Sequence, residues 1–180
     1  MKMNLKISLL LFLWIFPLLL PAQEYKFKHI GKEQGLSQSR VNCILQDKDG
    51  FIWFGTDDGL NKYNGQRIEV YKNDSKNEKT ISDNWINCFY EDENGTLWIG
   101  TLEGGLNEYN KFTNEFRSYQ FDNKNDNSIS NNNVYTIIRN DEKSLWIGTD
   151  DGLNLFDITT KKFTRFKDEM VQPGNPKHTI

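Results

Sequence analysis

Apolar residues alternate with polar ones over short runs along most of the chain, and the runs are separated by turn-forming residues such as Asn-Gly and Asp-x-x-Gly. Alternation with a period of two, bounded by Gly, Asn and Asp, predicts short β-strands joined by hairpin turns. Asparagine and aspartate cluster between the apolar runs and not in helical stripes. The pattern therefore predicts an all-β fold.

One stretch recurs three times: it reads WFGTDDGLNKY at 53–63, WIGTLEGGLNEY at 98–109 and WIGTDDGLNLF at 146–156. The tryptophans are 45 and 48 residues apart. A period of this length, with an aromatic residue and glycines at set offsets, is typical of a four-stranded propeller blade. The sequence thus predicts three four-stranded antiparallel β-propeller blades, at about 41–73, 86–121 and 134–168.

Long polar connections precede the second and third blades, and each contains an Ile-Ser pair five residues before the blade's first strand. Leu36-Ser37 holds that place before the first blade, and residues 178–180 resemble the same anchor, which predicts the start of a fourth blade. Residues 25–30 alternate as a strand that has no blade of its own. A propeller ring needs at least four blades, so we expect an incomplete ring with an N-terminal closing strand, as a fragment of a longer chain or an unusual assembly.

The N-terminus has a different character. Lys2 and Lys6 precede an apolar run over 7–20, and a small residue, Ala22, follows. This pattern predicts a secretory signal peptide over 1–22 and an exported mature domain over 23–180. The alternative is an uncleaved membrane anchor, for which a run of 14 residues that contains Pro17 is short.

The intact motif D-x-x-G-x-x-W-x-G-T-x-x-G-L over residues 47–60, and the opening GLSQSRV at 35–41, resemble the two-component regulator propeller repeat. The third copy has Asn140 for the aspartate and Lys143 for the turn glycine, and the second has an extra glycine. The resemblance implies the periplasmic sensor part of a hybrid two-component system histidine kinase. It also implies that the partners are the remaining blades and the kinase region of a longer parent chain, with an oligosaccharide as ligand. Any membrane contact would be through the missing part.

Repetition separates structural residues from candidate binding residues, because a residue that recurs in every blade serves the blade itself. By this criterion the tryptophans pack between blades, one set of glycines allows close approach of sheets, and another supplies positive φ in turns. The structural residues are Trp53, Gly55, Gly59, Trp98, Gly100, Gly105, Trp146, Gly148 and Gly152.

Candidate chemistry is sparse. The turns at 47–50 and 92–95 have some calcium-ligand character but lack the later glutamate of an EF-hand loop, so hairpin turns explain them better. The acidic pairs at 57–58 and 150–151 recur as turn residues, which disfavours a glycosidase dyad. His29 and His178 lie near no nucleophile. We expect no catalytic residue, no metal site and no cofactor, and a net charge of −3 disfavours nucleic acid as a partner.

Cys43 and Cys88 hold the same register in neighbouring blades, where the third blade has Thr136. An exported protein with two cysteines invites a disulfide. Equivalent positions on adjacent sheets should lie beyond the roughly 7 Å Cα separation that a bridge allows. We therefore predict two buried thiols.

The residue just before each first strand differs from blade to blade: it is Arg40, Trp85 or Asn133. If the first strands line a central channel, these residues share one rim with the turns at 57–58, 102–103 and 150–151. An arginine, a tryptophan and an asparagine can stack on a sugar ring and donate to its hydroxyl groups. The alternative is a set of ordinary solvated loops.

The sequence thus favours a binding module: a ligand-sensing propeller region for signal transduction, and not an enzyme in itself. That the ligand is a carbohydrate is implied by the resemblance alone. Two alternatives stay open, namely a fragment of a propeller polysaccharide hydrolase or lyase, and the non-functional product of a truncated gene.

Overall fold

The computed structural model describes residues 26–166, which form three four-stranded antiparallel sheets. The first consists of β1 (Val41–Gln46), β2 (Ile52–Thr56), β3 (Gly59–Tyr63) and β4 (Ile68–Tyr71). The second consists of β5 (Ile86–Glu91), β6 (Leu97–Thr101), β7 (Leu106–Asn110) and β8 (Glu115–Tyr119). The third consists of β9 (Val134–Arg139), β10 (Ser144–Thr149), β11 (Gly152–Asp157) and β12 (Lys162–Phe166).

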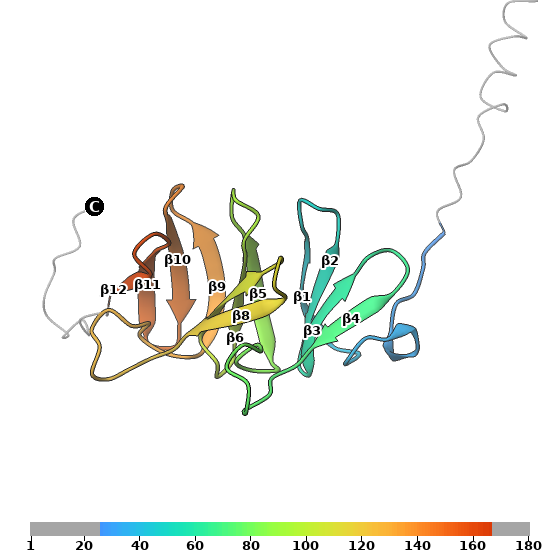
Figure 1. The fold of residues 1–180 in the computed structure, drawn as a ribbon, viewed down its shortest axis with the longest axis horizontal. Helices are drawn as coiled ribbons and strands as arrows, with labels where there is room; N and C mark the ends of the chain where they lie inside the picture. The colour runs from blue at the N-terminus through green and yellow to red at the C-terminus, as the bar shows by residue number, and fades with distance from the viewer. Residues whose placement is uncertain (1–25, 167–180) are drawn as a thin grey trace, which may run out of the picture.

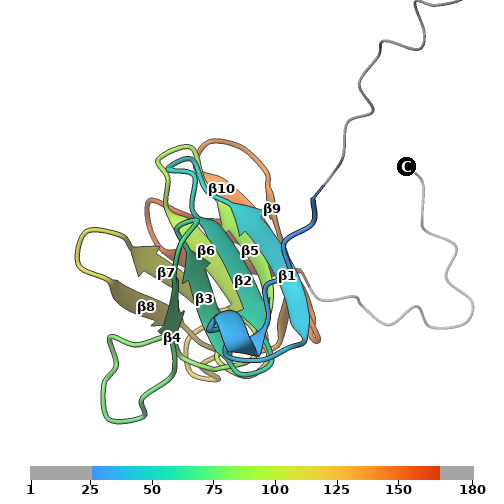
Figure 2. The same ribbon diagram turned by 90° about the vertical axis from the view of Figure 1, so that its right-hand side faces the viewer.

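In each sheet the strands follow one another in chain order, so each is a meander of the kind that makes up a propeller blade. The three blades stand in a row, with β1–β4 at one end and β9–β12 at the other (Figure 1), and Figure 2 views the row from the β1–β4 end. The first strands of neighbouring blades lie close together: the side-chain amide of Asn42 donates to the carbonyl of Ile86, and that of Asn87 donates to the carbonyl of Val134. The predicted fold class is confirmed.

The hydrophobic core lies between the blades. Trp53 and Leu60 of the first blade pack against Ile81 and Ile86, which lead into the second. Trp98 and Leu106 pack in the same way against residues leading into the third blade. A sheet that is apolar on both faces can be buried on both faces, and the middle blade has both of its faces covered.

Two polar contacts recur in all three blades and fix their local geometry. The indole nitrogens of Trp53, Trp98 and Trp146 donate to a side-chain oxygen of Asp47, Asp92 and Asn140 at 2.7, 3.1 and 3.0 Å. The same Asp47 and Asp92 carboxylates accept backbone N–H groups of their own turns. These side chains are therefore the hydrogen-bond acceptors of hairpin turns, as the sequence predicted.

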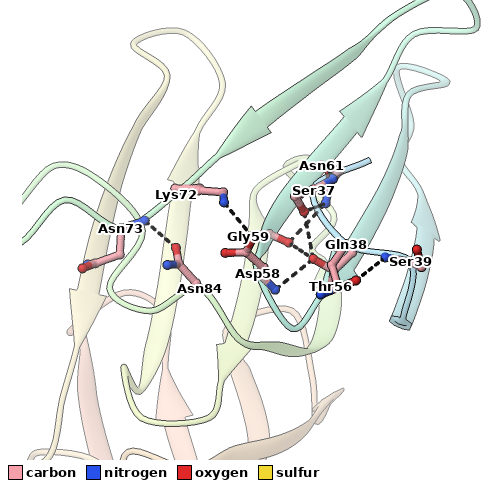
Figure 3. A network of polar contacts seen from close by, with 10 residues as sticks. All are labelled: Ser37, Gln38, Ser39, Thr56, Asp58, Gly59, Asn61, Lys72, Asn73 and Asn84. Atoms are coloured by element: carbon pink, nitrogen blue, oxygen red, sulfur yellow. Dashed lines mark hydrogen bonds and ion pairs between the residues drawn. The ribbon is translucent and has the colours of Figure 1, made fainter. Parts of the chain in front are cut away.

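The second recurrent contact is a buried asparagine that holds the connection before its blade. Asn61 accepts from the backbone N–H of Ser37 at 2.9 Å and donates to its hydroxyl at 2.9 Å (Figure 3). Asn107 and Asn154 make the same pair of bonds with Ser82 and Ser130. All three asparagines are fully buried, so each amide supplies the hydrogen bonds that water would otherwise make to the backbone N–H and the hydroxyl of the serine.

Residues 26–30 of the predicted N-terminal closing strand belong to no strand, and a 3-10 helix, η2 (Lys32–Gln34), follows. The partner expected for this strand would lie beyond residue 180, so its closing role stays a prediction. A strand requires a ladder of hydrogen bonds to a neighbour. The segment instead contributes single side chains, with the ammonium of Lys28 donating to the hydroxyl of Tyr63 and Ile30 packing near Phe54.

The expected signal peptide at 1–22 and the expected start of a fourth blade at 178–180 lie outside the described residues. Within residues 26–166, no helix is long and apolar enough to cross a membrane.

Candidate functional site: the rim before the first strands

Arg40, Trp85 and Asn133 immediately precede β1, β5 and β9, and each contacts the turn between the second and third strands of its own blade. Arg40 lies 3.5 Å from the carboxylate of Asp57, the carbonyl of Trp85 accepts from the N–H of Leu102 at 3.1 Å, and the amide of Asn133 donates to Asp150. The turns and the residues before the first strands therefore share one rim, as the alternating strand directions predicted.

The structure brings Arg40 and Trp85 together across the boundary between the first two blades. The guanidinium carbon of Arg40 lies 5.8 Å from the centre of the Trp85 ring, within the range of a cation–π contact. The Arg40 side chain is 69% exposed, so it is held loosely by one ring and one carboxylate. An exposed ion pair of this kind contributes little to stability, and both groups are available to a ligand.

Asn133 forms a separate part of the rim on the third blade. Its side-chain amide donates to Asp150, and its backbone N–H donates to the side chain of Asn131 at 2.8 Å. The hydrogen bond between the Tyr135 hydroxyl and Asp150 raises the pKa of that tyrosine, because ionisation would set a phenolate against a carboxylate. Tyr135 is half exposed and neutral across the physiological range, so it presents a hydroxyl and a ring face to solvent.

The sequence-based search missed three rim residues: Asn42, Asp83 and Tyr135. Asn42 donates to Asp57 at 2.8 Å and so holds the carboxylate that pairs with Arg40. Asp83 accepts from the backbone N–H groups of Trp85 and Glu103 and ties the connection to the turn. Tyr135 replaces an asparagine found at the equivalent positions 42 and 87, so its difference between blades was a usable signal.

The acidic pairs of the rim have structural partners. Asp57 contacts Asn42 and Arg40, and Asp58 pairs with the ammonium of Lys72 at 2.8 Å. Among residues 26–166, no group of three or more His, Cys, Asp or Glu side chains is placed to hold a metal ion. What the rim offers chemically is recognition: hydrogen-bond donors and acceptors beside two aromatic rings.

A hollow of ≈ 390 Å³ lies away from this rim, at the outer edge of the second blade, where Lys111 and Phe112 of the β7–β8 turn and Arg117 of β8 contribute to its walls. The side chains around it belong to one blade. We keep the rim as the candidate site because the variable positions of three blades meet a shared set of turns there.

Seven of the nine repeated residues lie at the blade interfaces and turns, and Trp146 and Gly148 lie on the outer face of the third blade. Trp53 and Trp98 are at most 1% exposed, whereas Trp146 is half-buried. Gly59, Gly105 and Gly152 have φ of 129°, 77° and 97°, the left-handed region that favours glycine. A Cβ at Gly55 would lie 2.7 Å from Cγ2 of Ile86, and one at Gly100 would lie 2.6 Å from Cγ1 of Val134, so these two glycines permit close approach of the next blade.

Cys43 and Cys88 are free thiols, and both residues are half-buried, so the structure shows less complete burial than the sequence suggested. Desolvation raises the pKa of each thiol to about 12. Both groups are therefore protonated and weakly nucleophilic at neutral pH.

Comparison with known proteins agrees with the blade geometry. The sequence model of the two component regulator propeller family matches residues 35–58, 80–103 and 128–151, one match per blade. Each of the three blades therefore contains a stretch that matches the two-component regulator propeller repeat.

The chain is similar to parts of larger proteins. Histidine kinase P4 of Formosa agariphila is 44% identical over 57 residues, which are 32% of this chain and 4% of that protein. The extracellular domain of a hybrid two component system of B. thetaiotaomicron, BT3049, superposes with a TM-score of 0.74 at 37% identity, over 83% of this chain and 21% of that one.

A third relative shares the fold alone: the extracellular domain of the B. thetaiotaomicron one component system BT4673 has a TM-score of 0.63 at 24% identity over 81% of this chain. The chain thus spans about a fifth of the extracellular domains that it matches, and far less of the curated kinase.

Proposed function

We propose that this chain is a ligand-sensing part of an extracytoplasmic propeller in a two-component signalling protein. The single observation that carries the proposal is the rim, where three blades of one repeat present three different residues, Arg40, Trp85 and Asn133, against a common set of turns. Blades that share a scaffold but differ at one rim suit recognition, because the rigid sheets position variable loops.

The propeller would act by binding and not by catalysis. Histidine kinase P4 and the hybrid two component system BT3049 support a sensor role, because similar blades occur in those signalling proteins. We propose that the partners of this chain are further blades and a kinase region in a longer parent protein. We further propose that residues 1–22 form the signal peptide that directs the domain 23–180 to the periplasm.

We propose an oligosaccharide as the ligand. The Trp85 ring offers an apolar face of the kind that stacks on a sugar ring, and the Arg40 guanidinium beside it donates hydrogen bonds in a fixed plane. The amide of Asn133 and the hydroxyl of Tyr135 add polar groups on the third blade. Among these four side chains, the charged one, Arg40, is largely exposed, so binding of a neutral hydroxyl does not require a charge to be buried without a partner.

Binding of a panel of neutral and acidic oligosaccharides to the 180-residue chain tests the proposal, with calorimetry and tryptophan fluorescence as readouts. We expect Trp85→Ala to weaken the binding of any active oligosaccharide by about tenfold or more, which corresponds to roughly 1.4 kcal/mol. Phe112→Ala is the matched control, because Phe112 is 88% exposed and lies away from the rim. Equal affinity of Trp85→Ala and wild type would exclude the rim, and failure of the whole panel would exclude the carbohydrate.

A further inference from the structure

The long connections before the second and third blades, residues 73–80 and 121–128, fold in the same way. Each makes two turns in which a backbone N–H donates to the carbonyl three residues earlier. These bonds run from Asn77 to Asp74, from Thr80 to Asn77, from Asn125 to Asp122 and from Ser128 to Asn125, at 2.9, 3.1, 3.2 and 3.0 Å. The two connections therefore present the same backbone groups at equivalent positions.

Each connection also lies against the outer strand of its own blade. The N–H of Phe116 in β8 donates to the carbonyl of Lys79 at 2.8 Å. The N–H of Phe163 in β12 donates to the carbonyl of Asn127 at 2.9 Å. The second and third blades therefore have one arrangement of connection and outer strand.

One residue of the outer strand differs in size and charge between these two blades. Two positions after the phenylalanine, β8 has Ser118 and β12 has Arg165. Strand register shows that the two positions are equivalent, because Ser118 pairs with Asn107 and Arg165 pairs with Asn154, the buried asparagines of their blades. The two blades thus differ by a long cationic side chain at this place.

In the third blade, Arg165 binds the connection with its guanidinium group. Its Nε donates to the carbonyl of Ser128 at 2.7 Å. Its Nη2 donates to the carbonyls of Asn125 and Asp122 at 2.8 and 3.3 Å, and to the hydroxyl of Ser128. The guanidinium carbon also lies 5.3 Å from the centre of the Phe121 ring. A planar group with fixed donors therefore matches the acceptors of this connection.

In the second blade, the equivalent place is a hollow of ≈ 470 Å³ between the connection and β8, which we call the connection hollow. Its walls include Asp74, Asn77, Thr80 and Ser118, the equivalents of Asp122, Asn125, Ser128 and Arg165. Ser118 is exposed, and Thr80 is half-buried where the equivalent Ser128 is only 7% exposed. The connection hollow thus has the equivalent acceptors but a serine in place of the arginine.

The charged side chains around the connection hollow are compatible with a cationic ligand. The ammonium of Lys79 pairs with the carboxylate of Glu115 at 2.8 Å. The guanidinium carbon of Arg117 lies 5.3 Å from the centre of an aromatic ring in its own strand. Asp74 and Glu78 add exposed acidic residues to the walls. Both basic side chains therefore have contacts of their own, and the acidic side chains add attraction for a cation.

We propose that the connection hollow binds a guanidinium group, of the kind that arginine carries, on the carbonyl oxygens of Asp74, Asn77 and Thr80. The carbonyls of Asp74 and Asn77 each accept a backbone N–H, and a carbonyl oxygen has a second lone pair for a further donor. The third blade supplies this group from its own chain, whereas the second blade takes it from a ligand. This site does not include the variable residues of the rim.

Backbone amide NMR spectra of the 180-residue chain test the proposal, with N-acetyl-arginine amide as the probe. We expect saturable shifts of residues 74–80 at about millimolar probe, and about tenfold weaker binding of N-acetyl-citrulline amide, which has the same shape without the charge. Residues 122–128 are the control within the molecule, because Arg165 already binds their acceptors. Equal responses to the two probes, or of the two connections, would overturn the proposal.

Exchange of the two strand residues tests the occupant of the hollow. Ser118→Arg supplies the guanidinium from within the chain, so it should abolish the response of residues 74–80 and raise Tm by about 2–4 °C. Arg165→Ser should extend the response to residues 122–128. Ser118→Met is the matched control, because it adds a long side chain without donors and should not raise Tm. Unchanged probe binding by folded Ser118→Arg would contradict the proposal.

Further probes distinguish the source of the guanidinium group. Tighter binding of free arginine than of a capped Gly-Arg-Gly peptide would support the site and assign it to a small molecule. The reverse order would support the site and assign it to an arginine residue of a peptide. Shifts of residues 74–80 with calcium chloride but not with the arginine probes would refute the proposal in favour of a metal site.

Discussion

At the scale of the residue, the buried asparagine that follows the repeated Gly-Leu pair does more than its position in a turn motif suggests. In the middle blade, Asn107 accepts the backbone N–H of Ser82 and donates to the Ser82 hydroxyl. These two hydrogen bonds hold the connection that precedes the second blade. Ile81, next to Ser82 in that connection, packs in the core between the first two blades. One amide therefore links the strand to the blade interface.

Replacement of this amide should be costly. Asn107→Ala leaves the N–H of Ser82 without its acceptor in a buried site, so we expect a loss of about 1–3 kcal/mol in the free energy of unfolding, measured by urea denaturation. Asn123→Ala, at an exposed asparagine of the next connection, should change it by less than about 0.5 kcal/mol. Equal effects of the two substitutions would argue against the asparagine as an anchor.

The two thiols give a prediction at the same scale. Burial raises their pKa, so folding favours the protonated form, and the stabilisation is fully present below the ordinary thiol value of 9.0. It should be lost as the pH rises from there toward about 12. We expect slow labelling by maleimide in the native chain at pH 7 and two labels per chain after denaturation without reductant. No label after denaturation would reveal a disulfide.

At the scale of the element, the blades differ in what their equivalent strands meet. Gly55 in β2 and Gly148 in β10 occupy the same place in the repeat. A Cβ at Gly55 would lie 2.5 Å from Sγ of Cys43 in its own sheet and 2.7 Å from Cγ2 of Ile86 in the following blade. Among the described residues, a Cβ at Gly148 would meet only a methyl group of Thr136, in its own sheet. The following blade therefore adds a contact at Gly55 that Gly148 does not have.

This difference predicts unequal effects of one substitution. Gly55→Ala should destabilise the chain by about 1–3 kcal/mol, because the added methyl group collides with Cys43 of its own sheet and with Ile86 of the second blade. Gly148→Ala should cost distinctly less, since among the described residues it displaces only one methyl group of Thr136. Thermal unfolding of the two variants measures both losses, and equal losses would contradict this account of the two glycines.

Also at this scale, one predicted element is absent. Residues 25–30 have the alternation of a strand, yet residues 26–30 pair with no described strand. Alternation marks a segment that can lie on a sheet, but a strand forms only where a neighbour offers free backbone groups. Each of the twelve strands of the blades has such a neighbour, because a short turn connects it to the next strand of its sheet.

At the scale of the whole molecule, both ends of the row of blades expose apolar side chains. Ile138, Leu153 and Phe166 lie at one end, and Ile44 and Val70 lie at the other. The inner faces of the row bury the equivalent positions. Each blade therefore buries its apolar faces only against the blades next to it in the row, and a face without a neighbouring blade stays exposed.

The strands, the hairpin turns and the number of blades followed from the sequence by itself, because alternation and turn chemistry act over a few neighbouring residues and recur with a fixed period. Repetition also identified the interface tryptophans and the variable rim residues Arg40, Trp85 and Asn133.

Only the tertiary structure decided which residues at equivalent positions of the three blades are buried in the core. Leu60, Leu106 and Leu153 each stand in the same Gly-Leu-Asn triplet, and the first two are buried while the third is exposed. It likewise decided that Arg40 lies over Trp85 from the next blade. Both outcomes depend on how whole blades pack on one another. That packing brings together segments 45 residues apart in the chain and removes their apolar side chains from water, which the local sequence does not determine.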